Sequence, residues 1–117
     1  MQRPSIIILN KMFISMFQLL WKVVKIIRYI TRNAQNRIPA ILQLFMWNLV
    51  DEMNIENRDY FQVFNLNAID GNQHIKHFQE QPEYSKEYTI LCDNPITSKV
   101  YIIIEDDYQT MLLAEDY

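Results

Sequence analysis

The chain has 117 residues, which suffice for one domain with a modest core, and half of them are apolar. Its single glycine, Gly71, excludes the glycine-rich phosphate loops of nucleotide-binding proteins, and its single cysteine, Cys92, excludes an internal disulfide and any multi-cysteine zinc site. The net charge of −3 is divided unevenly, because seven bases and no acid precede Asp51, whereas fourteen acids and four bases follow from there. A lone thiol is typical of a reducing compartment and predicts a cytoplasmic protein.

The first 25 residues read as an N-terminal amphipathic helical extension, followed by a single α+β domain over residues 26–117. Polar residues recur every three or four positions from Ser15 to Arg28, which places one polar stripe on an apolar helix. Lys22 and Lys25 interrupt the apolar run too early for a membrane span of about 20 residues.

Two interpretations of this helix stay open. It can lie on an anionic membrane surface through residues 12–30, or it can pack on its own domain or on a second copy, which we favour. Met12 and Met16 are alternative initiators, so we also consider that part of the segment lies upstream of the natural start.

Residues 26–31 are β-branched and aromatic and predict a strand, and residues 32–37 are polar and predict a loop. Apolar residues at helical spacing after Pro39 predict an amphipathic helix over residues 39–53. Strands are expected over residues 60–66, 73–79, 88–92, 99–105 and 108–114.

Asp70 and Gly71 together signal a hairpin turn between the first two of these strands, because glycine accepts a positive φ. The expected architecture is α+β: an antiparallel sheet of four to five strands packed on one main helix.

Three groups of residues carry side chains used in chemistry, and none of them predicts a catalytic or metal site. His74 and His77 are three apart on a strand, so they point to opposite faces and do not converge on a metal ion. Cys92 precedes an acid and lacks the electropositive surroundings that a nucleophilic thiol needs. The acids of the last two strands, if they converge, suit an acidic surface better than they suit catalysis. These acids are Glu105, Asp106, Asp107, Glu115 and Asp116. An alternative function is therefore an acidic mimic of nucleic acid that inhibits a nuclease or a DNA-binding protein.

Arg28, Tyr29 and Arg32 combine bases with an aromatic ring, as single-stranded nucleic-acid sites do. Because the chain from Arg28 onward is acidic overall, its field repels nucleic acid, and nucleic-acid binding through the basic N-terminal segment is an alternative function only.

Seven blocks of residues follow one another in a recognisable order: Arg28-Tyr29-Ile30-Thr31-Arg32, Ile38-Pro39, Leu42 to Trp47, Asp59 to Phe64, His77-Phe78-Gln79-Glu80, Pro82-Glu83-Tyr84 and Thr110 to Tyr117. In this order they resemble a family of small bacterial proteins catalogued as domain of unknown function 960, found in staphylococci, streptococci and their mobile elements. Residues 1–27 are outside the resemblance. The resemblance implies no activity, cofactor or catalytic residue.

The sequence therefore predicts a non-enzymatic protein-interaction module or mobile-element accessory factor without a cofactor, acting as a homo-oligomer or with another protein. Seven residues of the resembling blocks are expected to contact the partner, because a core role alone does not require their polar groups. They are Arg28, Tyr29, Arg32, Trp47, Gln62, Glu80 and Tyr84.

Overall fold

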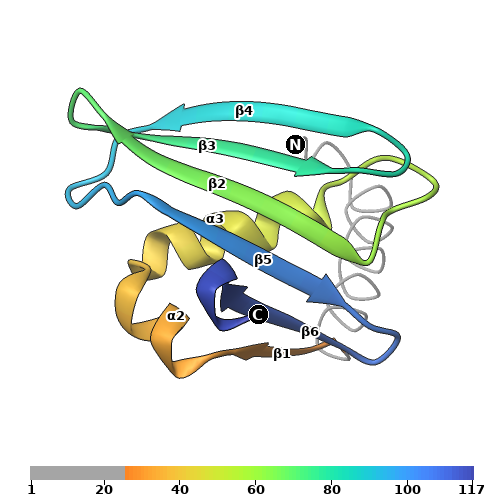
Figure 1. Ribbon diagram of the computed structural model, residues 1–117. Helices are drawn as coiled ribbons and strands as arrows, with labels where there is room; N and C mark the ends of the chain where they lie inside the picture. The colour runs from red at the N-terminus through yellow and green to blue at the C-terminus, as the bar shows by residue number, and fades with distance from the viewer. Residues whose placement is uncertain (1–25) are drawn as a thin grey trace, which may run out of the picture.

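The order of six strands defines the fold, which a computed structural model describes for residues 26–117 (Figure 1). The elements are β1 (Ile27–Ile30), α2 (Arg32–Arg37), α3 (Ala40–Asp51), β2 (Phe61–Ile69), β3 (Asn72–Gln79), β4 (Tyr84–Ile90), β5 (Ser98–Ile104), β6 (Tyr108–Leu113) and the 3-10 helix η1 (Ala114–Asp116). The strands lie in the order β1-β6-β5-β2-β3-β4. β1 runs parallel to β6, and the other neighbouring strands are antiparallel.

The expected antiparallel sheet of four to five strands on one main helix is wrong. The sheet is mixed and has six strands, and the two α-helices in the described part of the chain are short, with 6 and 12 residues. Most of the domain separates β1 from its parallel neighbour β6, so no local pattern reveals that they pair. The expected amphipathic helix over residues 1–25 lies outside the described residues.

The segment after β1 is a helix, although a loop was expected there. Thr31 caps α2, because its Oγ1 accepts a hydrogen bond from the Ala34 backbone N–H at 3.3 Å. Ala34 is fully buried and anchors this short helix. α2 ends at Arg37 since Ile38 precedes Pro39, which disfavours the helical conformation of the residue before it.

The helix expected over residues 39–53 is present as α3. Its buried residues recur at helical spacing and pack against the sheet: Leu42, Met46, Leu49 and Val50. α3 lies behind β2 and β5 in Figure 1, so it covers one face of the sheet. The core between them contains, from the strands, Phe64, Leu66, Ile75, Val100, Ile102, Met111 and Leu113.

The hairpin expected at Asp70 and Gly71 is confirmed. Both residues have positive φ, 52° and 78°, as a tight turn between twisted strands requires. This turn fixes the register in which Phe64 lies opposite His77 and Asn67 lies opposite His74.

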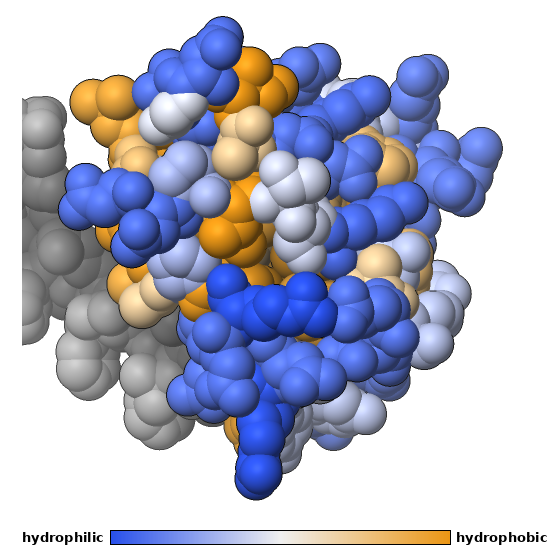
Figure 2. Space-filling view, turned by 60° about the vertical axis from the view of Figure 1, so that its left-hand side comes forward, coloured by the Kyte–Doolittle hydropathy of each residue, from blue (hydrophilic) through white to orange (hydrophobic). Residues whose placement is uncertain are grey.

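Because side chains alternate along a strand, the sheet has two different faces. The helix face carries the core residues and α3, whereas no described helix longer than η1 lies over the other face, which we call the open face. Seen from the side of α2 and the β2–β3 turn, apolar residues also reach the surface between hydrophilic ones (Figure 2).

Candidate functional site

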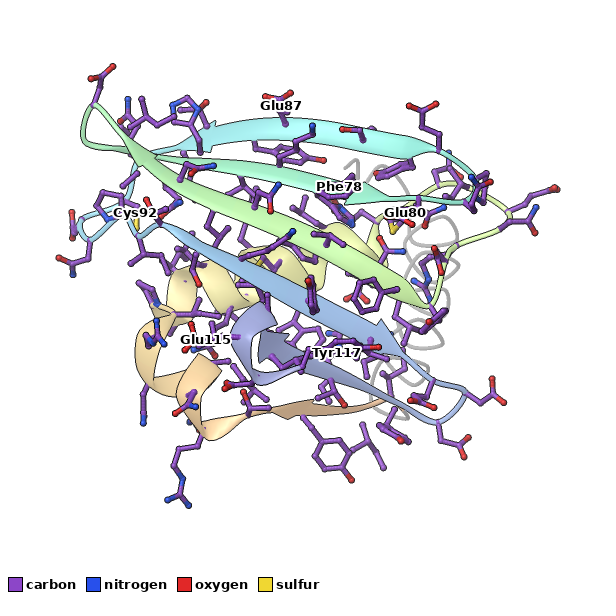
Figure 3. The ribbon with its side chains drawn as sticks, viewed as in Figure 1. Phe78, Glu80, Glu87, Cys92, Glu115 and Tyr117 are labelled. Carbon is purple, nitrogen blue, oxygen red and sulfur yellow. The ribbon has the colours of Figure 1, made fainter. Side chains whose placement is uncertain are left out.

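Aromatic rings cluster on the open face. The Phe61 ring centroid lies 4.6 Å from that of Tyr101 and 5.4 Å from that of Tyr117, and the two tyrosine rings are 5.6 Å apart. The chain turns back through η1 after β6, which brings Tyr117 over β5 (Figure 3). Tyr117 is 70% exposed, so the cluster borders solvent. Such rings supply large contact areas at binding surfaces.

The apolar surface continues to the β1 edge of the sheet. Tyr29 and Tyr108 meet edge to face with their ring centroids 5.7 Å apart, and they are 54% and 39% exposed. Ile27, which pairs with Tyr108, is 51% exposed. Contiguous exposed apolar residues of this kind mark interaction surfaces.

The half of the open face nearer the β2–β3 turn is polar. Lys99, Asn65, Lys76 and Glu87 are register partners in one row across β5, β2, β3 and β4. A hollow of about 250 Å³ lies over this half. Its lining includes Asn65, Asn67, His74, Lys76, Glu87 and Thr89. Both signs of charge are therefore present within one surface.

A buried polar network occupies the helix face near the end of β3. Gln62 Nε2 donates to Gln79 Oε1 and to the Asp59 carbonyl, each at 2.8 Å, and Gln62 Oε1 lies 2.7 Å from His77 Nε2. Because the amide nitrogen of Gln62 is already donating, His77 Nε2 must carry the proton and donate to Oε1. Gln79 Nε2 donates to the carbonyls of Asn57 and Pro82.

His77 is neutral in this network. Its ring stacks on Phe64 at 4.3 Å and meets Tyr84 edge to face at 5.5 Å. Burial lowers the pKa of His77 from 6.5 to about 4, because the core disfavours the charged imidazolium. Its Nδ1 is buried without a hydrogen-bond partner among the described residues.

A second polar cluster joins β1 to α3. Arg28 Nε donates to Gln109 Oε1 at 3.1 Å, its Nη2 donates to Asp51 Oδ1, and its guanidinium lies 4.7 Å from the Trp47 ring centroid. The three contacts use Nε, Nη2 and the face of the guanidinium. Arg28 and Trp47 thus hold the parallel strand to the helix.

A comparison with protein families decides what the chain is related to. The family described as staphylococcal protein of unknown function (DUF960) matches residues 27–116. The chain belongs to this family.

The expected resemblance is confirmed, and the family brings no described activity with it. A comparison with curated proteins gives no match. Among solved structures, the fold is similar to the crystal structure of a protein of unknown function from Enterococcus faecalis. The TM-score is 0.63 at 18% identity, over 78% of this chain and 90% of that one. At this identity the likeness shows the fold alone.

The seven residues expected to contact a partner do not form one site in this DUF960 member. Tyr29 lies on the open face, and Arg32 and Glu80 are exposed elsewhere. The remaining four belong to the interior or to the helix face: Arg28 and Trp47 in the β1–α3 cluster, and Gln62 and Tyr84 around His77.

Arg28 and Tyr29 point to opposite faces as neighbours on a strand, and Arg28 is engaged with Asp51. The proposed basic and aromatic patch at Arg28, Tyr29 and Arg32 is therefore not a single surface.

The acids of the last two strands do not converge either. Glu105, Asp106 and Asp107 lie at the turn before β6, and Glu115 and Asp116 lie beyond its far end in η1. Glu115 pairs with Arg37, and Asp116 accepts hydrogen bonds from Asn33.

His74 lies on the open face near Thr89, whereas His77 is in the core, as strand alternation predicts. Within residues 26–117, no three His, Cys, Asp or Glu side chains are grouped so as to hold a metal ion. Among the same residues, no helix has the length and hydropathy to cross a membrane.

Sequence reasoning missed Phe61, Tyr101 and Tyr117 as surface residues. Phe61 on β2 and Tyr101 on β5 occupy odd positions, opposite in parity to the core residues Phe64, Val100 and Ile102, and this alternation was the signal that could have found them. Tyr117 follows η1, so no strand pattern indicates its place.

Proposed function

We propose that this protein is a non-enzymatic interaction module that forms a homodimer through the open face of its sheet. The observation that carries the proposal is a six-stranded sheet with α3 on one face only and exposed aromatic rings on the other. A sheet face left uncovered in one copy is buried when a second copy packs on it.

The size of the open face fits such a contact. Six strands with 41 residues in total, spaced about 4.8 Å apart and with a rise of about 3.4 Å per residue, present a flat area of about 670 Å². Side chains that project from this flat area, together with the residues around its edges, raise the accessible area toward the ~800 Å² per partner that stable interfaces bury.

The charges of the open face also suit self-association. In a two-fold interface the same surface is used by both copies, so it must be complementary to itself. Lys76 and Lys99 lie in one row with Asn65, midway along β2, whereas Asp106 and Asp107 lie beyond the end of β5. Stacking two sheets about an axis in their plane, perpendicular to the strands and midway between this row and the β5–β6 turn, sets Lys99 of each copy near Asp106 and Asp107 of the other.

The placement of His77 supports a non-enzymatic role. An acid–base catalyst must exchange protons with a bound substrate. The histidine whose pKa is most altered is fully buried between Phe64 and the Gln62 amide, so it does not reach a substrate on the surface.

The mass of the full chain in solution tests the proposal, by light scattering over a range of protein concentrations. We expect twice the chain mass for the native protein and a single-chain mass for Tyr29→Lys and Tyr101→Lys, because both substitutions place a charge inside the contact. Leu44→Lys is the matched control, since Leu44 is exposed on α3, at 65%, away from the open face. Circular dichroism confirms that each variant is folded.

Three results would overturn the proposal. The native chain could be a monomer at all concentrations. Leu44→Lys could separate the copies while both tyrosine variants stay paired, which would place the contact on α3. Binding of single-stranded DNA that weakens steeply as salt rises and is lost in Tyr101→Lys would assign the open face to nucleic acid.

A further inference from the structure

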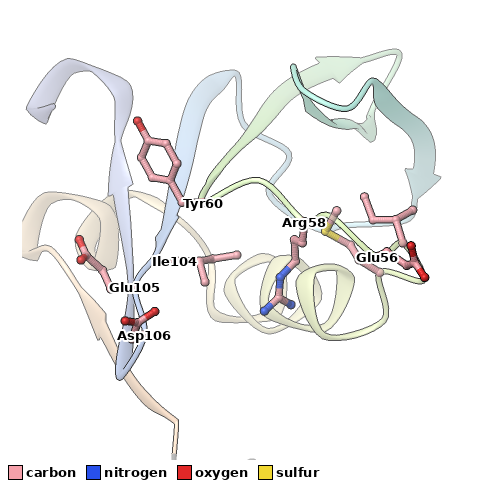
Figure 4. Close-up of a pocket in the computed structure, with 8 residues that line it drawn as sticks. Glu56, Arg58, Tyr60, Ile104, Glu105 and Asp106 are labelled. Atoms are coloured by element: carbon pink, nitrogen blue, oxygen red, sulfur yellow. The ribbon is translucent and has the colours of Figure 1, made fainter.

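A hollow of about 470 Å³ opens at one end of the sheet, between the segment that follows α3 and the β5–β6 turn (Figure 4). It borders the open face, because the ring centroid of its lining residue Tyr60 lies 5.9 Å from that of Phe61. Its apolar lining residues are Met53, Ile55, Tyr60 and Ile104, and its charged lining residues are Glu56, Arg58, Glu105 and Asp106. Tyr60 is 61% exposed, so an aromatic ring stands uncovered at the entrance.

The pocket has an excess of negative charge. Its one base, Arg58, donates through Nη1 to the Val50 carbonyl at 3.1 Å, so its head group is turned to the end of α3. The ion pairs between described residues, Arg28 with Asp51 and Arg37 with Glu115, use none of the carboxylates of the pocket. More acids surround the same end of the sheet: Asp59, Glu80, Glu83 and Asp107.

The topology brings the start of β1 to this end. Ile27 is the register partner of Tyr108, and Tyr108 directly follows the acidic β5–β6 turn. Because β1 is parallel to β6, the chain that precedes Ile27 joins the domain beside Asp106 and Asp107.

From these observations we propose that the acidic pocket binds the basic segment 1–25 of the same chain, which lies outside the described residues. The segment contains four bases (Arg3, Lys11, Lys22, Lys25) and no acid, for a charge of +4, whereas residues 26–117 contain seven bases and fourteen acids, for −7. The sum, 4 − 7, is the net charge of −3.

The acidic pocket and the basic segment are chemically complementary. The pocket lining combines the apolar side chains of Ile55 and Ile104 with the carboxylates of Glu56, Glu105 and Asp106. Lysine and arginine side chains suit such a place, because their stems pack on apolar atoms while the charged head meets carboxylates. The segment also supplies many apolar residues between its bases. Only residue 26 separates the segment from β1, so the local concentration of the segment at the pocket is high.

Trp21 makes the proposal testable in the full chain. The chain has two tryptophans, Trp21 and Trp47, so Trp47→Phe leaves Trp21 as the single reporter within the segment. We expect blue-shifted emission and weak quenching by acrylamide in this background. Adding Glu105→Lys should raise the quenching severalfold, because the charge reversal repels the segment. Lys22→Glu with Lys25→Glu should do the same.

The matched control is Asp93→Lys, which makes the same charge change at an exposed position near the opposite end of the sheet and should leave Trp21 protected. Equal quenching in all variants would overturn the proposal. So would protection of Trp21 that rises with protein concentration, which would assign the occupant to a second copy, or protection that requires anionic vesicles. The proposal does not rest on dimer formation, because Trp21 quenching and solution mass are separate readouts.

Discussion

Acidification should destabilise this protein through one histidine. His77 has a pKa of about 4 in the folded domain and about 6.5 in the unfolded chain, because burial disfavours its charged form. Below pH 6.5 the unfolded chain binds a proton that the folded domain does not, so the free energy of unfolding falls as the pH falls. Linkage gives a loss of about 2 kcal/mol at pH 5 and about 3 kcal/mol at pH 4, relative to neutral pH.

The hydrogen bonds around His77 explain why the folded domain does not stabilise a second ring proton. The orphaned Nδ1 would become a second donor, and Nε2 already donates to Gln62, whose amide nitrogen is committed to Gln79 and Asp59. No acceptor among the described residues stands opposite Nδ1. Protonation therefore creates a buried charge without a partner, which the core stabilises poorly.

Urea denaturation between pH 7.5 and pH 4.5, followed by fluorescence, measures the effect. The wild type should lose stability steeply below pH 6.5, and His77→Gln should lose most of that dependence, although its stability at pH 7.5 is lower. His74→Gln is the control, because His74 is partly exposed on the open face. Identical pH slopes for wild type and His77→Gln would refute the reasoning.

Three further predictions concern stability and are checked by urea denaturation at neutral pH. Arg28→Ala should cost about 2 kcal/mol, because it leaves the buried Gln109 amide unpaired and removes the contacts to the helix, whereas the exposed Arg32→Ala should change little. Gly71→Ala should cost about 1 kcal/mol because φ is +78°, and Gly71→Asn should be milder, since asparagine tolerates that region. Thr31→Ala should cost about 1 kcal/mol by removing the cap of α2, and Thr31→Ser should retain most of the stabilisation that the cap provides. If the two substitutions of any pair lowered the free energy of unfolding equally, the cause assigned to that pair would be contradicted.

Local patterns in the sequence located most elements, and the failures have physical causes. Strand β4 was expected from residue 88, but it begins at Tyr84. Ser85, Lys86 and Glu87 are exposed on this edge strand, and charged residues on an edge hide the apolar alternation by which strands are recognised. The α2 helix was missed because its six residues are polar, and only its Thr31 cap signalled a helix start.

The position of the open face was beyond local reasoning. β5 contains Tyr101, Ile102 and Ile103 in succession, a run that is apolar on both faces of the strand. Such a run predicts a strand covered on both sides. Because α2 and α3 both pack on the same side of the sheet, no described helix longer than η1 covers the face that carries Tyr101. The run is then explained if a second copy supplies the missing layer, as the proposed dimer requires.

Alternation also gives a way to separate folding from binding in this domain. Arg28 holds β1 to α3, while its neighbour Tyr29 lies on the open face, and Gln62 joins the buried network while its neighbour Phe61 belongs to the exposed cluster. Of two adjacent residues on these strands, one therefore stabilises the fold and the other belongs to the exposed face. Substitutions at Tyr29 should change association and leave the pH dependence set by His77 intact, whereas substitutions at Gln62 should alter that pH dependence first. If Tyr29→Lys moved the acid transition as strongly as a change at Gln62, the two faces would not be independent.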